Sequence, residues 1–215
     1  MENQRECIQG LGDRGGTLES RRYYQCRKTL LEMLADRGYD VVSHSLSRDH
    51  FRSLFGQQPN PESLSFSLSH LSNPSNRVQV IFAGTDDIRK QTILGIYKQI
   101  VGAETLNSLI LVVQSKMTSF ARKELENCRF KVEIIRMNDL LVNITKHVLQ
   151  PKYEVLTADE KKALLAKYSL EDKQLPYMLK TDAIARYYGL EKGQVIKITY
   201  SDAIVESLVA YRRVV

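Results

Sequence analysis

The sequence predicts two small domains: an α/β N-terminal domain with a mixed, partly parallel sheet, and an α+β C-terminal domain. Strand-like and helix-like apolar patterns alternate between residues 78 and 135, which favours a sheet with parallel strands. The helical period is lost between Leu140 and Pro151, which places the domain junction near residue 143. Strand-like segments at 193–200 and 208–215 close the chain.

Length and composition fit this two-domain organisation. The chain has 215 residues, of which 43% are hydrophobic and 26% charged, so two modest cores are possible. No apolar run approaches the roughly 20 residues of a membrane helix, and residues 1–18 lack the apolar segment of a secretory signal. We therefore expect a disordered leader over 1–18 and no membrane partner. Three scattered cysteines are too few for a disulfide framework and indicate a reducing compartment.

Two helices are expected at the start of the N-terminal domain. The first has helical apolar spacing and ends near Gly38, since glycine is suited to helix C-termini. Its expected apolar face consists of Tyr23, Cys26, Leu30, Met33 and Leu34. The second is predicted over 48–55, with Ser47 as its N-cap and Gly56 as its stop. Its expected apolar face consists of Phe51, Leu54 and Phe55.

The sheet of this domain and its crossover helices follow. Leu64, Phe66 and Leu68 alternate with serines, as in a half-buried strand, and a turn at 73–76 leads into a strand over 78–82. The continuous apolar run at 108–114 is typical of a strand covered on both faces. The other predicted elements are a helix near 87–100 with Ile93, Ile96, Tyr97 and Ile100 inward, a helix near 119–127, and a strand over 130–135.

The C-terminal domain carries clear cap and turn signals. Thr157 and Glu160 form a capping box at the start of a helix. Pro176 interrupts the chain, after which Asp182 is expected to cap a short helix that ends at Gly189. With the two closing strands, these elements predict a small α+β fold.

No pattern in the sequence is typical of catalysis or metal binding. The four histidines lie at no metal-ligand spacing from a cysteine, and there is no phosphate-binding glycine loop or serine-nucleophile elbow. At 82–87, Asp86 and Asp87 would repel an anion, so we interpret this helix start as an ordinary cap. These aspartates with Glu133 leave a degenerate nuclease as one alternative. We expect no catalytic residue, cofactor, metal or small-molecule substrate.

A second helix start, near residue 118, has the chemistry of a phosphate contact. The net charge of +6 permits nucleic-acid binding, although basic and acidic residues are mixed along the chain. Thr118 is a credible N-cap, and the exposed amides beside it would suit a DNA phosphate. The cations nearby are Lys116, Arg122 and Lys123. A plain capped helix with solvated cations is the alternative.

The segment over 139–199 resembles the fifth shared subunit of eukaryotic nuclear DNA-dependent RNA polymerases. The resemblance is carried by DLLVNITKHVLQPKYEVLTADEKKALLAKYSLEDKQLP and by ARYYGLEKGQVIKI, and this C-terminal part also resembles a small subunit of archaeal RNA polymerases. It extends more loosely through RKTLLEMLADRGYDV and LILVVQSKMTSFAR. It implies a non-catalytic nuclear subunit with a jaw domain over 19–143 and an assembly domain over 144–215.

The resemblance also implies partners and contact residues. The jaw domain would lie beside downstream double-stranded DNA without reading its sequence, and the assembly domain would dock on the largest subunit among the other subunits. The implied DNA contacts are Lys116, Thr118, Ser119, Arg122 and Lys123. The implied largest-subunit contacts are His147, Pro176, Tyr177, Arg186, Tyr187, Lys192 and Gln194.

Several positions depart from the family pattern. Ser119 replaces the proline of a Thr-Pro motif, Tyr177 replaces the arginine of a Leu-Pro-Arg motif, and the C-terminal tail is shortened. Because such changes fall on docking surfaces, we interpret the chain as a plant paralogue from a specialised polymerase that makes non-coding RNA for gene silencing. A free-standing DNA-binding or chromatin adaptor is the alternative.

Overall fold

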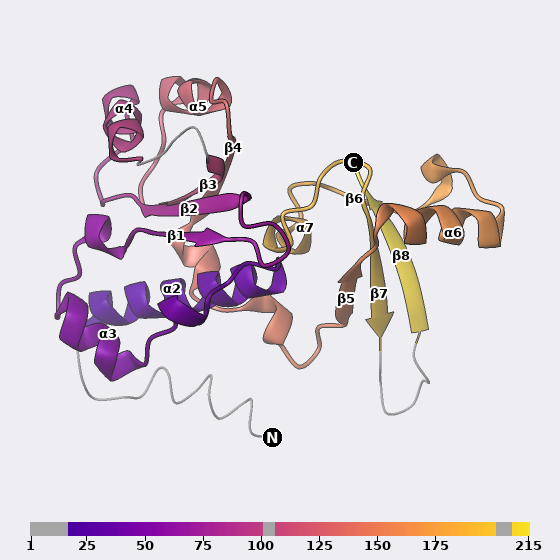
Figure 1. The fold of residues 1–215 in the computed structure, drawn as a ribbon, viewed down its shortest axis with the longest axis horizontal. Coiled ribbons are helices and arrows are strands. Elements are labelled where there is room, and N and C mark those ends of the chain that lie inside the picture. Colours follow the sequence, from indigo (N-terminus) through magenta and orange to yellow (C-terminus); the bar gives the residue numbers. More distant parts are fainter. Residues whose placement is uncertain (1–16, 101–105, 201–207) are drawn as a thin grey trace. The chain divides into compact units, whose positions relative to one another are not determined.

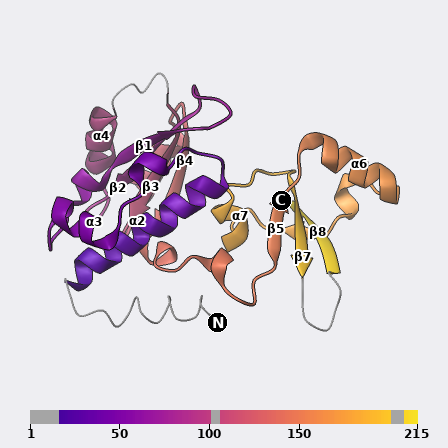
Figure 2. The ribbon, with the colours of Figure 1, turned by 60° about the horizontal axis from the view of Figure 1, so that its bottom comes forward.

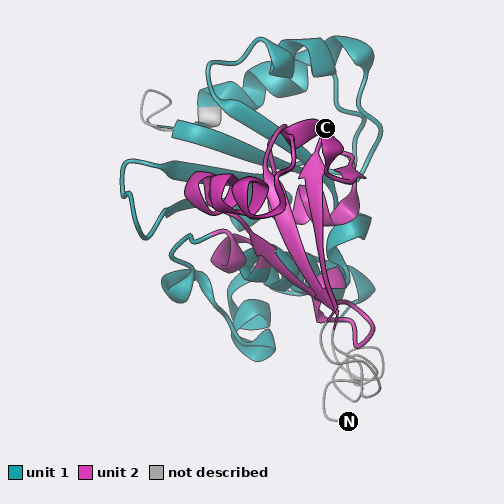
Figure 3. Ribbon diagram, turned by 90° about the vertical axis from the view of Figure 1, so that its right-hand side faces the viewer, with its two compact units in different colours: residues 1–32, 38–142 teal, residues 33–37, 143–215 magenta. Residues whose placement is uncertain are grey.

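The computed structural model describes residues 17–100, 106–200 and 208–215 (Figure 1). The predicted leader over 1–18 therefore lies outside the described residues, except for its last two positions. The chain divides into two compact units, residues 1–32 with 38–142 and residues 33–37 with 143–215 (Figure 3). Among the described residues, no helix combines the length and apolar character needed to cross a membrane.

Helix α2 spans Leu18–Asp36, as the apolar spacing predicted. Its expected apolar residues are all buried, and burial raises the pKa of the Cys26 thiol to about 12. Gly38 follows the helix with φ +89°, a left-handed conformation that glycine adopts without steric cost.

Helix α3 spans Arg48–Phe55, and the predicted N-cap is confirmed. The Ser47 hydroxyl accepts a hydrogen bond from the His50 amide at 3.3 Å. The expected apolar face is wrong at Leu54, which is 58% exposed, while Phe51 is fully buried. At about 100° per residue, Leu54 lies about 60° to one side of Phe51 and Phe55 about 40° to the other. The Phe51 ring contacts the Phe55 ring, so the core lies on the Phe55 side and Leu54 faces solvent.

A four-stranded sheet in the order β1-β2-β3-β4 forms the centre of the first unit. Strands β1 and β2 pair antiparallel, whereas β2 with β3 and β3 with β4 pair parallel, so the predicted mixed sheet is confirmed. The strands are β1 Phe66–Ser69, β2 Arg77–Phe82, β3 Leu106–Val113 and β4 Lys131–Arg136.

Helices α4 (Lys90–Gln99) and α5 (Ser119–Glu126) cover one face of this sheet, and α2 with α3 covers the other (Figure 1, Figure 2). The α4–α5 face buries Ile93 and Ala121 against strand residues such as Leu109. The last five residues of β3 are buried, as the continuous apolar run predicted. The centre of the sheet therefore has no face exposed to solvent.

Strand β1 begins later than the alternation of residues 63–71 predicted. Leu64 is buried, as expected, but it lies in the 3-10 helix Pro61–Leu64. The Asn60 side chain caps this turn by accepting a hydrogen bond from the Glu62 amide at 3.1 Å. A local cap thus competes successfully with strand pairing at the start of the alternation.

Helix α4 also begins later than predicted, and the two aspartates before it are not its cap. Its N-cap is Arg89, so the interpretation of Asp86 and Asp87 as an ordinary cap is wrong. The cause is a parallel β-bridge between Ile88 and Met117, which keeps the chain extended up to the helix start.

The second unit contains another four-stranded sheet, in the order β5-β7-β8-β6 (Figure 1). Strand β7 pairs antiparallel with β5 and β8, while the two-residue β6 pairs parallel with β8. Leu164 of helix α6 packs with Val195 of β7, and Ile184 of helix α7 packs with the neighbouring Ile196, so the helices cover opposite faces. The elements are β5 Lys152–Val155, α6 Ala158–Tyr168, β6 Tyr177–Met178, α7 Ala183–Tyr187, β7 Val195–Tyr200 and β8 Leu208–Val214.

The predicted caps of the second unit are confirmed, but two of its strands were not predicted. The Thr157 hydroxyl accepts from the Glu160 amide at 3.3 Å, and the Glu160 carboxylate accepts from the Thr157 amide at 2.8 Å. Asp182 accepts from the Ile184 amide at 2.8 Å. Strands β5 and β6 are too short for a periodic signal and exist through pairing with distant strands. Over both units, the described residues also form the 3-10 helices η1 Val42–His44, η4 Met137–Leu140, η5 Ile144–Lys146 and η6 Asp172–Gln174.

Replacing Gly38 by alanine should lower the free energy of unfolding by about 1–2 kcal/mol, because a Cβ is strained at positive φ. That Cβ would also lie 2.9 Å from Nε2 of His70. The matched control is Gly95→Ala in α4, where nothing lies within 4 Å of the added Cβ. It should raise stability by about 0.5–1 kcal/mol through helix propensity. Urea unfolding of both variants checks the pair, and equal changes would contradict the role given to Gly38.

Candidate nucleic-acid and subunit interfaces

The N-terminus of α5 presents unpaired amides to solvent. The Thr118 hydroxyl accepts a hydrogen bond from the Ala121 amide at 3.3 Å, which confirms the predicted N-cap. Thr118, Ser119 and Phe120 are all exposed, and the Phe120 side chain is 72% exposed. The first amides of a helix have no acceptor within the helix. Those of Ser119 and Phe120 can therefore donate to an anion from outside.

This helix start is attached to the loop that follows β2. The Ile88 amide donates to the Lys116 carbonyl at 3.0 Å, and the Thr118 amide donates to the Ile88 carbonyl at 3.1 Å. The Thr118 hydroxyl also donates to the Ile88 carbonyl, at 3.3 Å. Two loops that follow neighbouring parallel strands are thus joined edge to edge, which fixes where α5 begins.

Three exposed cations surround the helix start, and none forms an ion pair with another described residue. They are Lys116, Arg122 and Lys123. By contrast, Lys90 of α4 lies 3.0 Å from Glu124 of α5, so its charge is already compensated. Asp86 and Asp87 are exposed on the adjoining loop and weaken the local positive field. The geometry therefore suits a weak phosphate contact that does not depend on base sequence.

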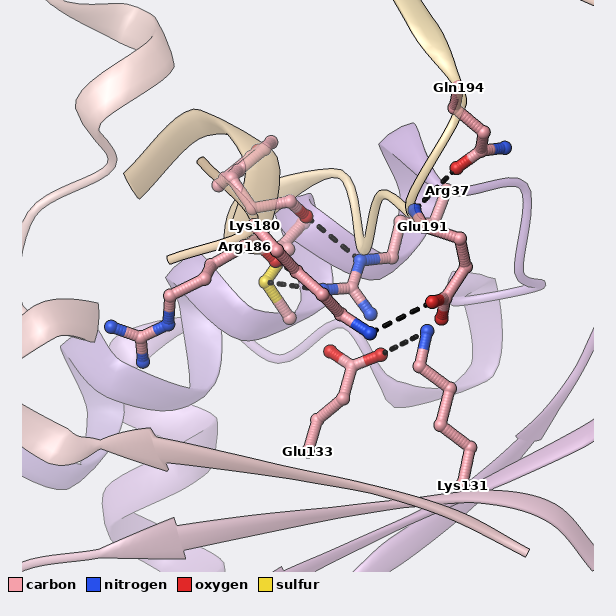
Figure 4. A network of polar contacts seen from close by, with 9 residues as sticks. Arg37, Lys131, Glu133, Lys180, Arg186, Glu191 and Gln194 are labelled. Carbon is pink, nitrogen blue, oxygen red and sulfur yellow. Dashed lines mark hydrogen bonds and ion pairs between the residues drawn. The ribbon is translucent and has the colours of Figure 1, made fainter. Parts of the chain in front are cut away.

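The carboxylates considered for a nuclease do not form a cluster. Glu133 lies in the middle of β4 and 3.3 Å from the ammonium of Lys131 (Figure 4). Asp86 and Asp87 follow the end of β2, which is separated from β4 by β3. In the part of the chain that the structure describes, no group of three or more His, Cys, Asp or Glu side chains could hold a metal ion.

Pro176 and Tyr177 lie together at one edge of the second unit's sheet. Tyr177 begins β6, pairs with Arg213 of β8, and is 59% exposed. Its hydroxyl donates to the Lys173 carbonyl at 3.3 Å. The Pro176 carbonyl accepts from the Arg213 amide at 2.8 Å. An exposed proline and an exposed aromatic ring are thus fixed to the sheet by backbone pairing.

Lys192 and Gln194 lie at the same end of this sheet. Both are exposed, in the turn that precedes β7. The Gln194 side chain accepts from the Glu191 amide at 2.6 Å (Figure 4). The Gln194 carbonyl accepts from the amide of Val214, the same residue of β8 that pairs with Met178 of β6. This turn and strand β6 therefore flank one end of β8.

A carboxylate that the sequence analysis missed joins these two segments. Asp172 lies 2.6 Å from the Lys161 ammonium and 2.8 Å from the Arg213 guanidinium. Lys161 also donates to the Gly193 carbonyl at 2.8 Å. The close Lys161 ammonium, together with the Arg213 guanidinium, holds the pKa of Asp172 below its usual range. No local pattern could reveal this group, because its members come from α6, η6 and β8.

Arg186 and Tyr187 at the end of α7 have different environments. The Arg37 guanidinium donates to the Tyr187 carbonyl at 2.8 Å and to the Arg186 carbonyl at 2.7 Å (Figure 4). These bonds provide donors for carbonyls at the helix C-terminus and place a positive charge at the negative end of the helix dipole. The Arg186 side chain is exposed. Tyr187 is only 6% exposed, and its hydroxyl donates to Asp36 at 2.7 Å and accepts from Asn143 at 3.2 Å. Burial raises its pKa. The Tyr187 ring therefore belongs to the core of the unit and is not presented to a partner.

His147 lies apart from the end of the sheet that carries Tyr177. It is exposed, and its Nδ1 accepts from the Leu149 amide at 3.2 Å. It precedes β5, whose first residue pairs with Thr199 at the far end of β7. The structure thus brings together four of the seven predicted contacts of the second unit. They are Pro176, Tyr177, Lys192 and Gln194.

The cations at the start of α5 and the polar side chains at the end of the second unit's sheet are features suited to contact with other macromolecules. Models of RNA polymerase Rpb5 match both parts of the chain, the N-terminal domain at residues 17–100 and the C-terminal domain at 142–214. The chain belongs to the Rpb5 family of DNA-directed RNA polymerase subunits, which confirms the resemblance seen in its sequence.

Relatives are named as subunits of polymerase V, of polymerases IV and V, and of polymerases I, II, and III. The chain is 46% identical over 211 residues to DNA-directed RNA polymerase V subunit 5C of Arabidopsis thaliana. These aligned residues cover 97% of this chain and 90% of that protein. It is 43% identical over 210 residues to the polymerases IV and V subunit 5B of the same plant, covering 97% and 96%. It is 35% identical over 207 residues to the polymerases I, II, and III subunit RPABC1 of Caenorhabditis briggsae, covering 92% and 98%.

Replacing Ser119 by proline should raise the free energy of unfolding by about 0.4–1 kcal/mol. Ser119 is the first helical residue of α5, and Thr118 before it has φ −70° and ψ 154°, which a following proline tolerates. Proline in the helix interior, at Lys123, should instead cost about 3 kcal/mol or more. Differential scanning calorimetry compares the variants, and a loss of stability in Ser119→Pro would show that its amide is needed.

Proposed function

We propose that this chain docks on the largest subunit of a nuclear RNA polymerase through its second unit and places its first unit beside downstream DNA. It contributes structure and no catalytic group, a role supported by its match to a family whose members are named as polymerase subunits. The observation that carries the proposal is the match of both Rpb5 domains along one chain.

The docking surface proposed for the second unit is the end of its sheet around Tyr177. Exposed aromatic rings with one polar group are common anchors at protein interfaces. Tyr177 is such a ring, and Pro176, Lys192 and Gln194 extend the same end of the sheet. Arg186 and His147 are also exposed and remain proposed contacts, whereas Tyr187 is buried and is no longer proposed to touch the partner.

The DNA contact proposed for the first unit is the start of α5. Two unpaired amides, the Thr118 cap and three uncompensated cations converge there. The helix dipole adds a partial positive charge at the same place. None of these groups reads base edges, so the contact would be independent of sequence.

We further propose that the polymerase is a plant enzyme for RNA-directed DNA methylation and gene silencing in the nucleus. Two relatives named as subunits of polymerases IV and V share 43–46% identity with the chain, against 35% for a subunit of polymerases I, II and III. Mass spectrometry of the native complex tests this, because the largest subunit recovered identifies the enzyme. A chain that runs alone near 24.7 kDa would instead favour a free-standing DNA-binding or chromatin adaptor.

Reversing the charges of Lys116, Arg122 and Lys123 to glutamate should reduce crosslinking of the assembled polymerase to downstream DNA. Each phosphate contact removed should also lower the slope of affinity against salt by about 0.9. The control reverses Lys28, Arg77 and Lys98, three exposed cations of the same unit. Arg77 and Lys98 lie at the opposite end of the sheet, because β2 begins and α4 ends there. Equal loss in both triple variants would indicate a general charge effect and place the DNA elsewhere.

Replacing Tyr177 by arginine should shift partner choice towards the largest subunit of the general messenger-making polymerase. An arginine can pair with a carboxylate in a bidentate way that tyrosine cannot copy. An unpaired carboxylate buried in the partner would cost about 1–3 kcal/mol, which discriminates between partners. Competitive co-purification against two largest subunits measures the shift. Tyr177→Phe, which loses only the hydrogen bond to Lys173, is the control, and equal partition of both variants would place selection elsewhere.

A further inference from the structure

We infer that Asp172 is the positioning residue of the docking surface, holding strand β6 and the turn over 191–194 in one fixed arrangement. The inference rests on the proposed docking function, because it concerns the same end of the second unit's sheet. Asp172 itself lies in η6 and is not among the residues proposed to touch the partner.

One arm of the Asp172 network reaches strand β6. Its Oδ2 lies 2.8 Å from Nε of Arg213, and Arg213 is the residue opposite Tyr177 in the β6–β8 pairing. The Arg213 amide also donates to the Pro176 carbonyl at 2.8 Å. Asp172 therefore restrains the side chain of Arg213, which is the residue paired with the exposed Tyr177.

The other arm reaches the turn before β7. Oδ1 of Asp172 lies 2.6 Å from the Lys161 ammonium, which also donates to the Gly193 carbonyl at 2.8 Å. Gly193 has φ +91° and lies between the proposed contacts Lys192 and Gln194. A single carboxylate thus connects both segments of the surface through two cations.

The network is sheltered enough for its geometry to matter. The side chains of Arg213 and Lys161 are 16% and 23% exposed, and that of Asp172 is 37% exposed. Ion pairs that form a network with low exposure contribute more than isolated surface pairs. Loss of the Asp172 charge would release the Arg213 guanidinium beside Tyr177, and release Lys161 from one of its two anchors.

The test compares Asp172→Asn with Glu154→Gln in the full chain. Glu154 is a matched control, because its carboxylate also joins two cations, Lys152 and Lys197, each at 2.9 Å. It lies on β5, at the sheet edge opposite β6. Both variants lose two ion pairs, and both melting temperatures are measured first. Both variants should remain folded at 20 °C, where retention is measured. A lower melting temperature by itself should therefore not reduce the amount of partner retained.

Retention is measured by co-purification with the largest subunit of Arabidopsis polymerase V. We expect Asp172→Asn to be retained about fivefold less than wild type. Asp172→Glu, which restores the carboxylate, and Glu154→Gln should stay within about twofold of wild type. If Asp172→Asn does not fold, Lys161→Met removes one arm, keeps the apolar stem, and should show a smaller loss in the same direction.

The outcomes separate this inference from the proposed function. Equal retention of Asp172→Asn and Glu154→Gln would overturn the positioning role while leaving docking intact. Failure of the wild-type chain to retain the partner would overturn docking, and this inference with it. A fivefold loss confined to the Asp172 variant would establish the role, because general destabilisation affects both variants alike.

Discussion

The parallel pairing of β2, β3 and β4 is the constraint on which the first unit depends. Parallel strands require crossover helices, which here become α4 and α5, and these helices bury the central strand together with α2 and α3. The same pairing brings the loops after β2 and β3 side by side, where Ile88 and Met117 form a bridge. The start of α5 is therefore placed by strand pairing, and Thr118 only completes it.

The second unit depends on a different constraint, which is the shortness of its edge strand β6. This strand has only two residues. Its backbone pairs with β8 over only these two positions, Tyr177 with Arg213 and Met178 with Val214. Ion pairs from Asp172 to Lys161 and Arg213 add side-chain contacts around it. The unit also includes residues 33–37, and Arg37 donates hydrogen bonds to the last carbonyls of α7. Polar contacts between distant segments thus supplement a small core.

Both proposed surfaces coincide with departures from the family pattern. Ser119 occupies a position where proline would stiffen the helix start, and Tyr177 occupies one where arginine could pair with an acid. Neither change disturbs the fold, because both side chains are exposed and the surrounding backbone is fixed by pairing. A family member can therefore change its contacts at these positions while keeping its architecture.

The sequence by itself determined the features that depend on neighbouring residues. Local hydrogen bonding determined the helix caps, which are Ser47, Thr118, Thr157 and Asp182. Apolar spacing determined the order of helices and strands in the first unit. Only the tertiary structure decided the late start of α4, strands β5 and β6, the burial of Tyr187 and the Asp172 network. Each of these arises from contacts between residues far apart in the chain. A local sequence pattern cannot predict such contacts, because strand pairing and burial depend on the whole folded core.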